Sequence, residues 1–148
     1  MRVVLQRAKE ASVRVDHEIV GQISHGYVLL VGFCQNDGLA QIEYCVKKIA
    51  NLRIFNDEQG KLNLSLAQVG GQILSISQFT LYAQTKKGNR PSFTQAQAPE
   101  IAAKNYALFN EMLRQQGFEV QTGRFGADMQ VQLQNDGPVT IIYDTENK

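Results

Sequence analysis

The apolar run from Tyr27 to Phe33 constrains the fold of this 148-residue chain more than any other segment. Its sequence, YVLLVGF, carries no charged side chain, and such a run is typical of a strand that is buried on both faces. The preceding segment, residues 3–15, alternates apolar and polar side chains, which indicates a strand with one buried face. A sheet that contains these two strands needs further layers to cover it.

Helical periodicity occurs in two separate places. In residues 39–50 apolar side chains recur about every 3.6 residues, and Asn36-Asp37 offers an N-terminal cap. A longer helix is expected to begin at Pro99, where the missing N–H costs little, and to end at Gly117. The remaining patterns predict strands at 19–23, 72–82, 118–121, 129–134 and 139–143. Because helices and strands do not alternate regularly, we predict an α+β fold with mostly antiparallel or mixed sheets and two main helices.

The composition fits a single globular domain over residues 1–148, because 43% of the residues are hydrophobic and 20% are charged. No apolar run approaches the roughly 20 residues that cross a bilayer. The first residues carry scattered charges rather than the apolar stretch of a secretory signal, so we expect a cytoplasmic protein. Many strands in a short chain leave sheet edges exposed, and we therefore expect a homodimer that completes the sheets into a barrel-like core.

The residue types of common catalytic and metal sites are scarce. The chain has two His, two Cys and a formal net charge of +1, which excludes a strongly basic coat for nucleic acid. His17 and His25 fall in predicted turns, and Cys34 and Cys45 are expected to be small buried apolar residues. No zinc, P-loop or dinucleotide-binding motif is present. We therefore expect neither a metal nor a cofactor.

The segment Ser77-Gln78-Phe79-Thr80-Leu81-Tyr82 places hydroxyls and an amide in a strand that is otherwise apolar. Burying such groups without hydrogen-bond partners is costly. Either neighbouring strands satisfy them, or the strand ends there and lines a pocket. Periodicity favours the continuous strand, because Thr and Tyr are ordinary strand residues.

Two further segments are unusual. The loop Lys86-Lys87-Gly88-Asn89-Arg90-Pro91-Ser92-Phe93 lies within residues 59–99, which contain no acidic residue. A basic loop with an aromatic side chain fits a phosphate-binding role, and a solvated loop explains it equally well. The segment Asn135-Asp136-Gly137-Pro138 has good turn chemistry before the last strand, and its X–Pro bond has access to the cis isomer.

Together these segments resemble the D-aminoacyl-tRNA deacylase family, also called D-tyrosyl-tRNA deacylase. The resemblance extends along the whole chain. It rests on the opening MRVVLQRAKEASVRV, the SQFTLYA run, the KKGNRPSF loop, the GRFGADMQV segment at 123–131 and NDGPVT near the end.

The resemblance implies a homodimeric hydrolase with its active site at the subunit interface. Its substrate is expected to be the ester between a D-amino acid and the terminal adenosine of tRNA, with no membrane or DNA partner. The residues implied are Thr80, Ser77, Phe79 and Gln78 for catalysis; Gly137, Pro138 and Arg7 for the chirality filter; and Phe125, Met129, Lys86, Lys87 and Arg90 for tRNA and its adenosine.

By the same resemblance, a Gly–cis-Pro element at Gly137-Pro138 enters the other subunit's pocket and is steadied by Arg7. Rigid backbone carbonyls there exclude the side chain of an L-amino acid, and the achiral glycyl ester is expected to escape this exclusion. Backbone N–H groups around Phe79 and Thr80 are expected to hold the developing oxyanion. We favour attack by a water, positioned by Thr80 or by the ribose 2′-hydroxyl, over a nucleophilic Thr80, because no base partner for Thr80 is evident.

Two other functions remain open from the sequence. One is a module that binds the acceptor end of tRNA without catalysis, through the cations of the basic loop. The other is a general esterase for small D-amino esters. Release of D-tyrosine from D-tyrosyl-tRNA distinguishes the enzyme from the module, and dependence on the nucleotide end distinguishes it from the esterase.

Overall fold

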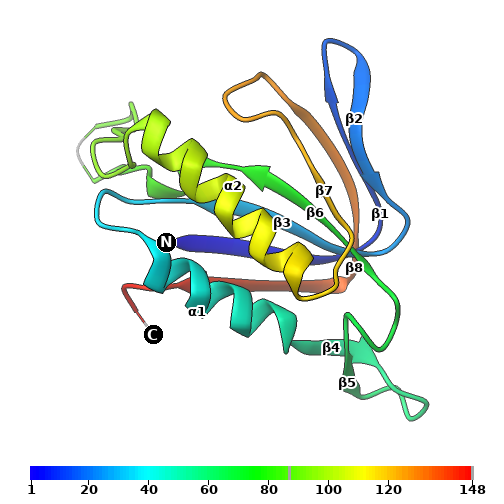
Figure 1. Ribbon diagram of the computed structural model, residues 1–148. Helices are drawn as coiled ribbons and strands as arrows, with labels where there is room; N and C mark the ends of the chain where they lie inside the picture. Colours follow the sequence, from blue (N-terminus) through cyan, green and yellow to red (C-terminus); the bar gives the residue numbers. More distant parts are fainter. Residues whose placement is uncertain (87, 148) are drawn as a thin grey trace.

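The computed structural model describes residues 1–86 and 88–147, so the expected tRNA-binding residue Lys87 lies outside the described residues. Two helices and a set of strands follow one another along the chain (Figure 1). The elements are β1 (Arg2–Val15), β2 (Glu18–Ile23), β3 (Gly26–Gly32), α1 (Leu39–Ala50), β4 (Arg53–Asn56), β5 (Leu62–Ser65), β6 (Gln72–Ser77), the 3₁₀ turn η1 (Phe79–Tyr82), α2 (Pro99–Gln115), β7 (Val120–Thr122) and β8 (Gln130–Asp144).

Among the residues that the structure describes, the main sheet has six strands. One edge of β1 pairs first with β3 and then with β2, its other edge pairs with β8, and β6 and β7 extend the sheet beyond β3. β1 runs antiparallel to β2, β3 and β8, whereas β3, β6 and β7 are parallel. The sheet curls so far that a Cβ on Gly21 of β2 would lie 2.8 Å from the Thr122 carbonyl oxygen of β7. This mixed, nearly closed and barrel-like sheet confirms the predicted α+β class.

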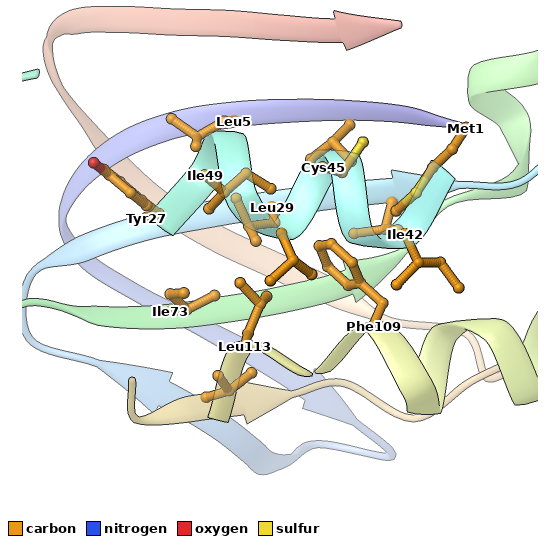
Figure 2. Packing of buried hydrophobic residues seen from close by; sticks show 14 of the residues in the cluster. Met1, Leu5, Tyr27, Leu29, Ile42, Cys45, Ile49, Ile73, Phe109 and Leu113 are labelled. Carbon is orange, nitrogen blue, oxygen red and sulfur yellow. The ribbon is translucent and has the colours of Figure 1, made fainter. Parts of the chain in front are cut away.

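Both helices cover one face of the sheet, and the larger hydrophobic core lies between the helices and that face (Figures 1 and 2). Ile42, Cys45 and Ile49 of α1 meet Phe109 and Leu113 of α2 over the strands, and all five are fully buried. A second cluster fills the inside of the curled sheet and includes Val28 and Leu74. β3 contributes to both clusters, so the prediction that the Tyr27–Phe33 run is buried on both faces is confirmed.

The strand predicted over residues 72–82 is too long, because its second half is not a strand in the structure. β6 ends at Ser77, and residues 79–82 form η1. The Gln78 N–H donates to the Val31 carbonyl at 2.7 Å, after which the chain turns away from β3. Periodicity misled here because Gln78 and Thr80, whose side chains fit a strand pattern, follow the end of the strand.

The predicted break at residues 135–138 is also wrong. β8 is continuous from Gln130 to Asp144, and its two halves pair with the same long strand β1 rather than with each other. The turn-forming residues instead occupy an irregular stretch, where the β1–β8 register shifts on either side of Ala8. Here the stretches of β8 on either side of the turn-forming residues both pair with β1 rather than with each other. These residues therefore do not reverse the chain.

Smaller differences concern boundaries. α1 is capped by Gly38 rather than by Asn36-Asp37, because the Asp37 carboxylate instead accepts the Cys34 N–H at 2.6 Å. The hairpin β4–β5 was not expected, and β7 begins two residues later than predicted.

Within the described ranges, neither helix is long and apolar enough to cross a membrane.

Candidate functional site

A pocket of about 620 Å³ opens where β3 and β6 end, beside the start of α2. Its walls come from four stretches of chain: 31–33, 76–79, 93–102 and 125–131. Most of the lining is apolar or aromatic, and the polar groups are few, as expected of a site for a small organic group. Gly32 allows the turn after β6, since a Cβ there would lie 2.8 Å from the Gln78 carbonyl oxygen.

Three of the four residues expected at the catalytic site line this pocket, namely Ser77, Gln78 and Phe79. Thr80 lies next to it and is exposed. The Gln78 side-chain amide donates to Thr80 Oγ1 at 2.6 Å, which fixes that hydroxyl and leaves its hydrogen for another acceptor. Within η1 the Leu81 N–H is the first to donate, to the Gln78 carbonyl, so the N–H groups of Phe79 and Thr80 precede the turn's own bonds.

Arg2 anchors the far end of η1, a role that nothing in its sequence context indicated. Its Nη1 donates to the Leu81 carbonyl at 3.0 Å, its Nε to Asp144 Oδ2 at 3.1 Å, and its guanidinium lies 4.6 Å from the Tyr82 ring centroid. Burial opposes ionisation of Asp144, but the N–H of Glu146, the Asn147 amide and Arg2 together lower its pKa. The ends of β1, β8 and η1 are thus tied together.

Phe125 and Met129, which the resemblance assigns to the terminal adenosine, also line the pocket and form the wall contributed by residues 125–131. The Phe125 ring lies 6.0 Å from that of Tyr106, whose hydroxyl donates to the Ser75 carbonyl of β6 at 2.8 Å. Burial raises the pKa of Tyr106, so its hydroxyl remains a donor at neutral pH. In the sequence, Tyr106 is one of the recurring apolar residues of the helix that begins at Pro99, and only its position in the structure reveals that it supports this wall.

The basic loop reaches the pocket through Phe93, whose ring centroid lies 5.0 Å from that of Phe79. Gln84 and Ser92 exchange two backbone hydrogen bonds, of 2.8 and 3.0 Å, and hold the loop's base together. Lys86 and Arg90 are exposed beyond this base, and neither forms an ion pair with any residue the structure describes. Phe93 follows directly and lines the pocket.

Gly137 and Pro138 lie elsewhere, exposed on β8 with a cis peptide bond between them. Arg7 supports this segment from inside. Its Nε donates to the Asp136 carbonyl at 3.1 Å and lies 3.2 Å from the Asp136 carboxylate, and its Nη1 donates to the Ile54 carbonyl at 2.6 Å. The Arg7 side chain is only 8% exposed.

The pocket and the Gly137-Pro138 segment do not meet within one chain. Ser77 pairs with Val31 and lies near one end of the sheet, whereas Asn135 pairs with Ala8 near the level of Gly26. About five residues along the strands and three strands across separate them, on the order of 20 Å along the sheet. Neither Gly137 nor Pro138 lines the pocket.

The histidines and cysteines take no part in the pocket. His17 lies in the exposed turn after β1, and the Nε2 of His25 lies 3.1 Å from the Val69 carbonyl. Cys34 and Cys45 are buried, as predicted. Across residues 1–86 and 88–147, no three His, Cys, Asp or Glu side chains gather closely enough to hold a metal ion.

Comparisons with known proteins point to one family. The model of the family described as D-Tyr-tRNA(Tyr) deacylase matches residues 4–144. The D-aminoacyl-tRNA deacylase of Bifidobacterium animalis subsp. lactis is 56% identical over 155 residues, covering 99% of this chain and 98% of that protein. The D-aminoacyl-tRNA deacylase of Limosilactobacillus reuteri is 57% identical over 144 residues, covering 97% and 99%.

Two solved structures share the fold along nearly the whole chain. A c-Myc DNA Unwinding Element Binding Protein is 42% identical, with a TM-score of 0.92 and coverage of 98% of this chain and 99% of that one. A probable eukaryotic D-amino acid tRNA deacylase has a TM-score of 0.83 at 18% identity, covering 96% and 97%. At that identity the second likeness shows the fold alone.

Proposed function

The chain belongs to the D-Tyr-tRNA(Tyr) deacylase family, and from this premise we propose that its pocket binds the aminoacyl end of D-aminoacyl-tRNA and hydrolyses the ester there. The products are the free D-amino acid and the tRNA. One observation carries the proposal: Ser77, Gln78 and Phe79 end β6 at the mouth of a pocket of about 620 Å³. Its walls are apolar enough to accept varied side chains.

The reaction needs little activation of the substrate by the protein, because an aminoacyl ester is already reactive toward water. The N–H groups of Phe79 and Thr80 precede the first hydrogen bond of η1 and are suited to hold the developing oxyanion, an interaction worth about 3–4 kcal/mol per donor. The Thr80 hydroxyl, fixed by Gln78, is suited to orient the attacking water. Neither histidine lines the pocket, which favours a water or the substrate's 2′-hydroxyl over a nucleophilic Thr80.

Rejection of L-amino acids is proposed to need a second copy of the chain. Gly137 and Pro138 are exposed and lie on the order of 20 Å from their own pocket, which supports the proposal that they act on the pocket of a neighbouring copy. Arg7 holds the segment rigidly through Asp136, as a filter of fixed shape requires. A homodimer of this kind would also cover part of the sheet. A glycyl ester has no side chain to exclude and is expected to be hydrolysed as well.

The first test compares hydrolysis of D-tyrosyl-tRNA and L-tyrosyl-tRNA by the purified protein. We expect release of D-tyrosine with little release of L-tyrosine. Binding of the tRNA without release of either amino acid contradicts the proposal and favours a binding module. Equal hydrolysis of D-tyrosine methyl ester and D-tyrosyl-tRNA would instead indicate a general esterase.

The second test asks which subunit supplies the filter. Ala127→Trp fills the pocket of one chain, and Gly137→Ala impairs the filter of another. The Gly137→Ala protein alone should hydrolyse L-tyrosyl-tRNA. Refolded with an excess of Ala127→Trp chains, its open pockets should face intact filters and lose the L-directed activity while keeping the D-directed one. Persistence of both activities in the mixture shows that each chain filters its own pocket.

A further inference from the structure

The rings of Phe79 and Phe93 form an aromatic pair at the mouth of the pocket. Their centroids are 5.0 Å apart at an interplanar angle of 69°, an edge-on arrangement. Phe79 is 57% exposed although Phe side chains are usually buried, and both residues line the pocket. An exposed aromatic ring next to a ligand pocket offers a face on which a planar group can stack.

The pair is held in place even though Phe93 belongs to a loop. Ser92, just before it, exchanges two backbone hydrogen bonds with Gln84, and two residues after it the Gln95 carbonyl accepts the Gln35 N–H at 3.2 Å. Gln35 also donates from its side chain to the Thr94 carbonyl at 2.7 Å. Phe93 is therefore fixed on one side by the bonds that close the base of the loop and on the other by bonds to Gln35, which follows β3.

The charges around the pair favour a nucleotide as its occupant. Arg90 lies three residues before Phe93, within a chain span of about 11 Å, and Lys86 follows shortly after Gln84. Residues 59–99 contain no acidic residue, and neither Lys86 nor Arg90 forms an ion pair with a described residue. Aromatic faces beside unpaired cations are the combination with which proteins bind single-stranded nucleic acid.

The arrangement of these groups indicates the path that the bound RNA takes away from the pocket. Phe125 and Met129, which the resemblance assigns to the terminal adenosine, line the same pocket as Phe79 from another stretch of chain, residues 125–131. An RNA chain that leaves the pocket toward the basic loop would first pass Phe79 and Phe93 and then the cations Arg90 and Lys86. We propose that the Phe79–Phe93 pair stacks the base of the nucleotide that precedes the terminal adenosine, while Arg90 and Lys86 bind the phosphates beyond it. This inference rests on the proposed function and adds a second nucleotide to it.

The test compares two small substrates that differ by one nucleotide, D-tyrosyl-adenosine and D-tyrosyl-cytidylyl-adenosine. The wild-type protein should hydrolyse the longer ester with the higher kcat/KM, because stacking one base on an aromatic side chain improves binding about tenfold. Phe93→Leu should lose most of that advantage. Phe93→Tyr, which restores an aromatic face, should retain it.

Two controls make the result specific. Phe125→Leu removes a ring from the other wall and should lower kcat/KM for both esters by the same factor. Leu62→Ala removes an exposed apolar side chain on β5 and should change neither value. Sedimentation of each variant shows whether its oligomeric state is preserved.

Three outcomes overturn the inference. They are an unchanged advantage of the longer ester in Phe93→Leu, an equal loss on both esters, and dissociation of the oligomer by this substitution, which would place the pair in a subunit interface. Failure of the wild-type protein to hydrolyse D-tyrosyl-tRNA would defeat the proposed function itself. That result is separate from these three.

Discussion

The pocket at the end of β6 and the Gly137-Pro138 segment of β8 are built in opposite ways. The pocket is hollow, and its walls come from four separate stretches of chain with few polar groups. The β8 segment is an exposed projection supported from inside by a single buried arginine. The hollow and the projection do not meet within one chain, and the proposed function brings them together across two copies of the chain.

Two arginines of β1 show how each region is held. Arg2 reaches the Leu81 carbonyl at the pocket end, and its side chain is 31% exposed. Arg7 reaches Asp136 and Ile54 at the projection end, and its side chain is 8% exposed. Because water competes more strongly for the exposed pair, the projection should depend on its arginine more than the pocket does.

The largest expected effect is that of Arg7→Leu. It leaves the Ile54 carbonyl and the Asp136 carboxylate without their donor, which should lower the free energy of unfolding by about 3 kcal/mol. Urea unfolding measures this loss. Arg14→Leu on the same strand serves as the control and should cost much less, since Arg14 forms no ion pair among the described residues. Equal losses would show that Arg7 is not a special support.

Gly137→Ala should damage the filter while leaving the pocket intact. Gly137 has a φ of +128°, and an added Cβ would lie 2.8 Å from Val139 Cγ2 and 3.2 Å from Arg7 Nη2. We expect the ratio of D-tyrosyl-tRNA to L-tyrosyl-tRNA hydrolysis to fall about tenfold or more, equivalent to about 1.4 kcal/mol. Gly60→Ala, at a φ of +77° with open space around it, should cost stability without changing this ratio.

Thr80→Ala tests the pocket alone. If the hydroxyl only orients a water, its loss should lower kcat by about two- to tenfold, the value of one hydrogen bond. Thr85→Ala, an exposed threonine further along the chain, provides the control. A loss of about a thousandfold or more, or a trapped acyl-enzyme, would identify Thr80 as the nucleophile.

Neutralising the basic loop should act on binding rather than on chirality. Lys86→Gln with Arg90→Gln should raise KM for the tRNA ester. It should also reduce the salt dependence of binding by a slope of about 0.7 for each phosphate that the protein no longer neutralises. Lys47→Gln with Lys61→Gln removes the same charge outside the loop and should leave the slope unchanged. An unaltered slope in the first variant would remove the loop from the tRNA interface.

The smallest effect concerns pH and the Arg2 end of the molecule. The pKa of Asp144 is lower in the folded chain than its ordinary value of 3.8, despite opposing burial, because Glu146, Asn147 and Arg2 donate to it. Its stabilisation is therefore complete above pH 3.8 and is lost as the pH falls below that value. Asp144→Asn should flatten this acid dependence by at most about 1 kcal/mol. An identical acid profile in the variant would contradict this account.

Much of the fold was predictable because it depends on local patterns. The run Tyr27–Phe33 required covering layers, the 3.6-residue periodicity located both helices, and turn residues marked most boundaries. The same local reasoning misplaced the end of β6 and divided β8 in two. Whether Ser77–Tyr82 continues a strand depends on how far β3 extends beside it, and local periodicity carries no such information.

The candidate site divides in the same way. The scarcity of His and Cys and the motifs that indicate the family were readable from the order of residues alone. Only the tertiary structure brought residues 31–33, 76–79, 93–102 and 125–131 around one pocket, and placed Arg2, Tyr106 and Phe93 behind or beside it. It also separated the pocket from Gly137-Pro138, because positions distant in sequence meet or part according to strand order and register, which are properties of the whole sheet.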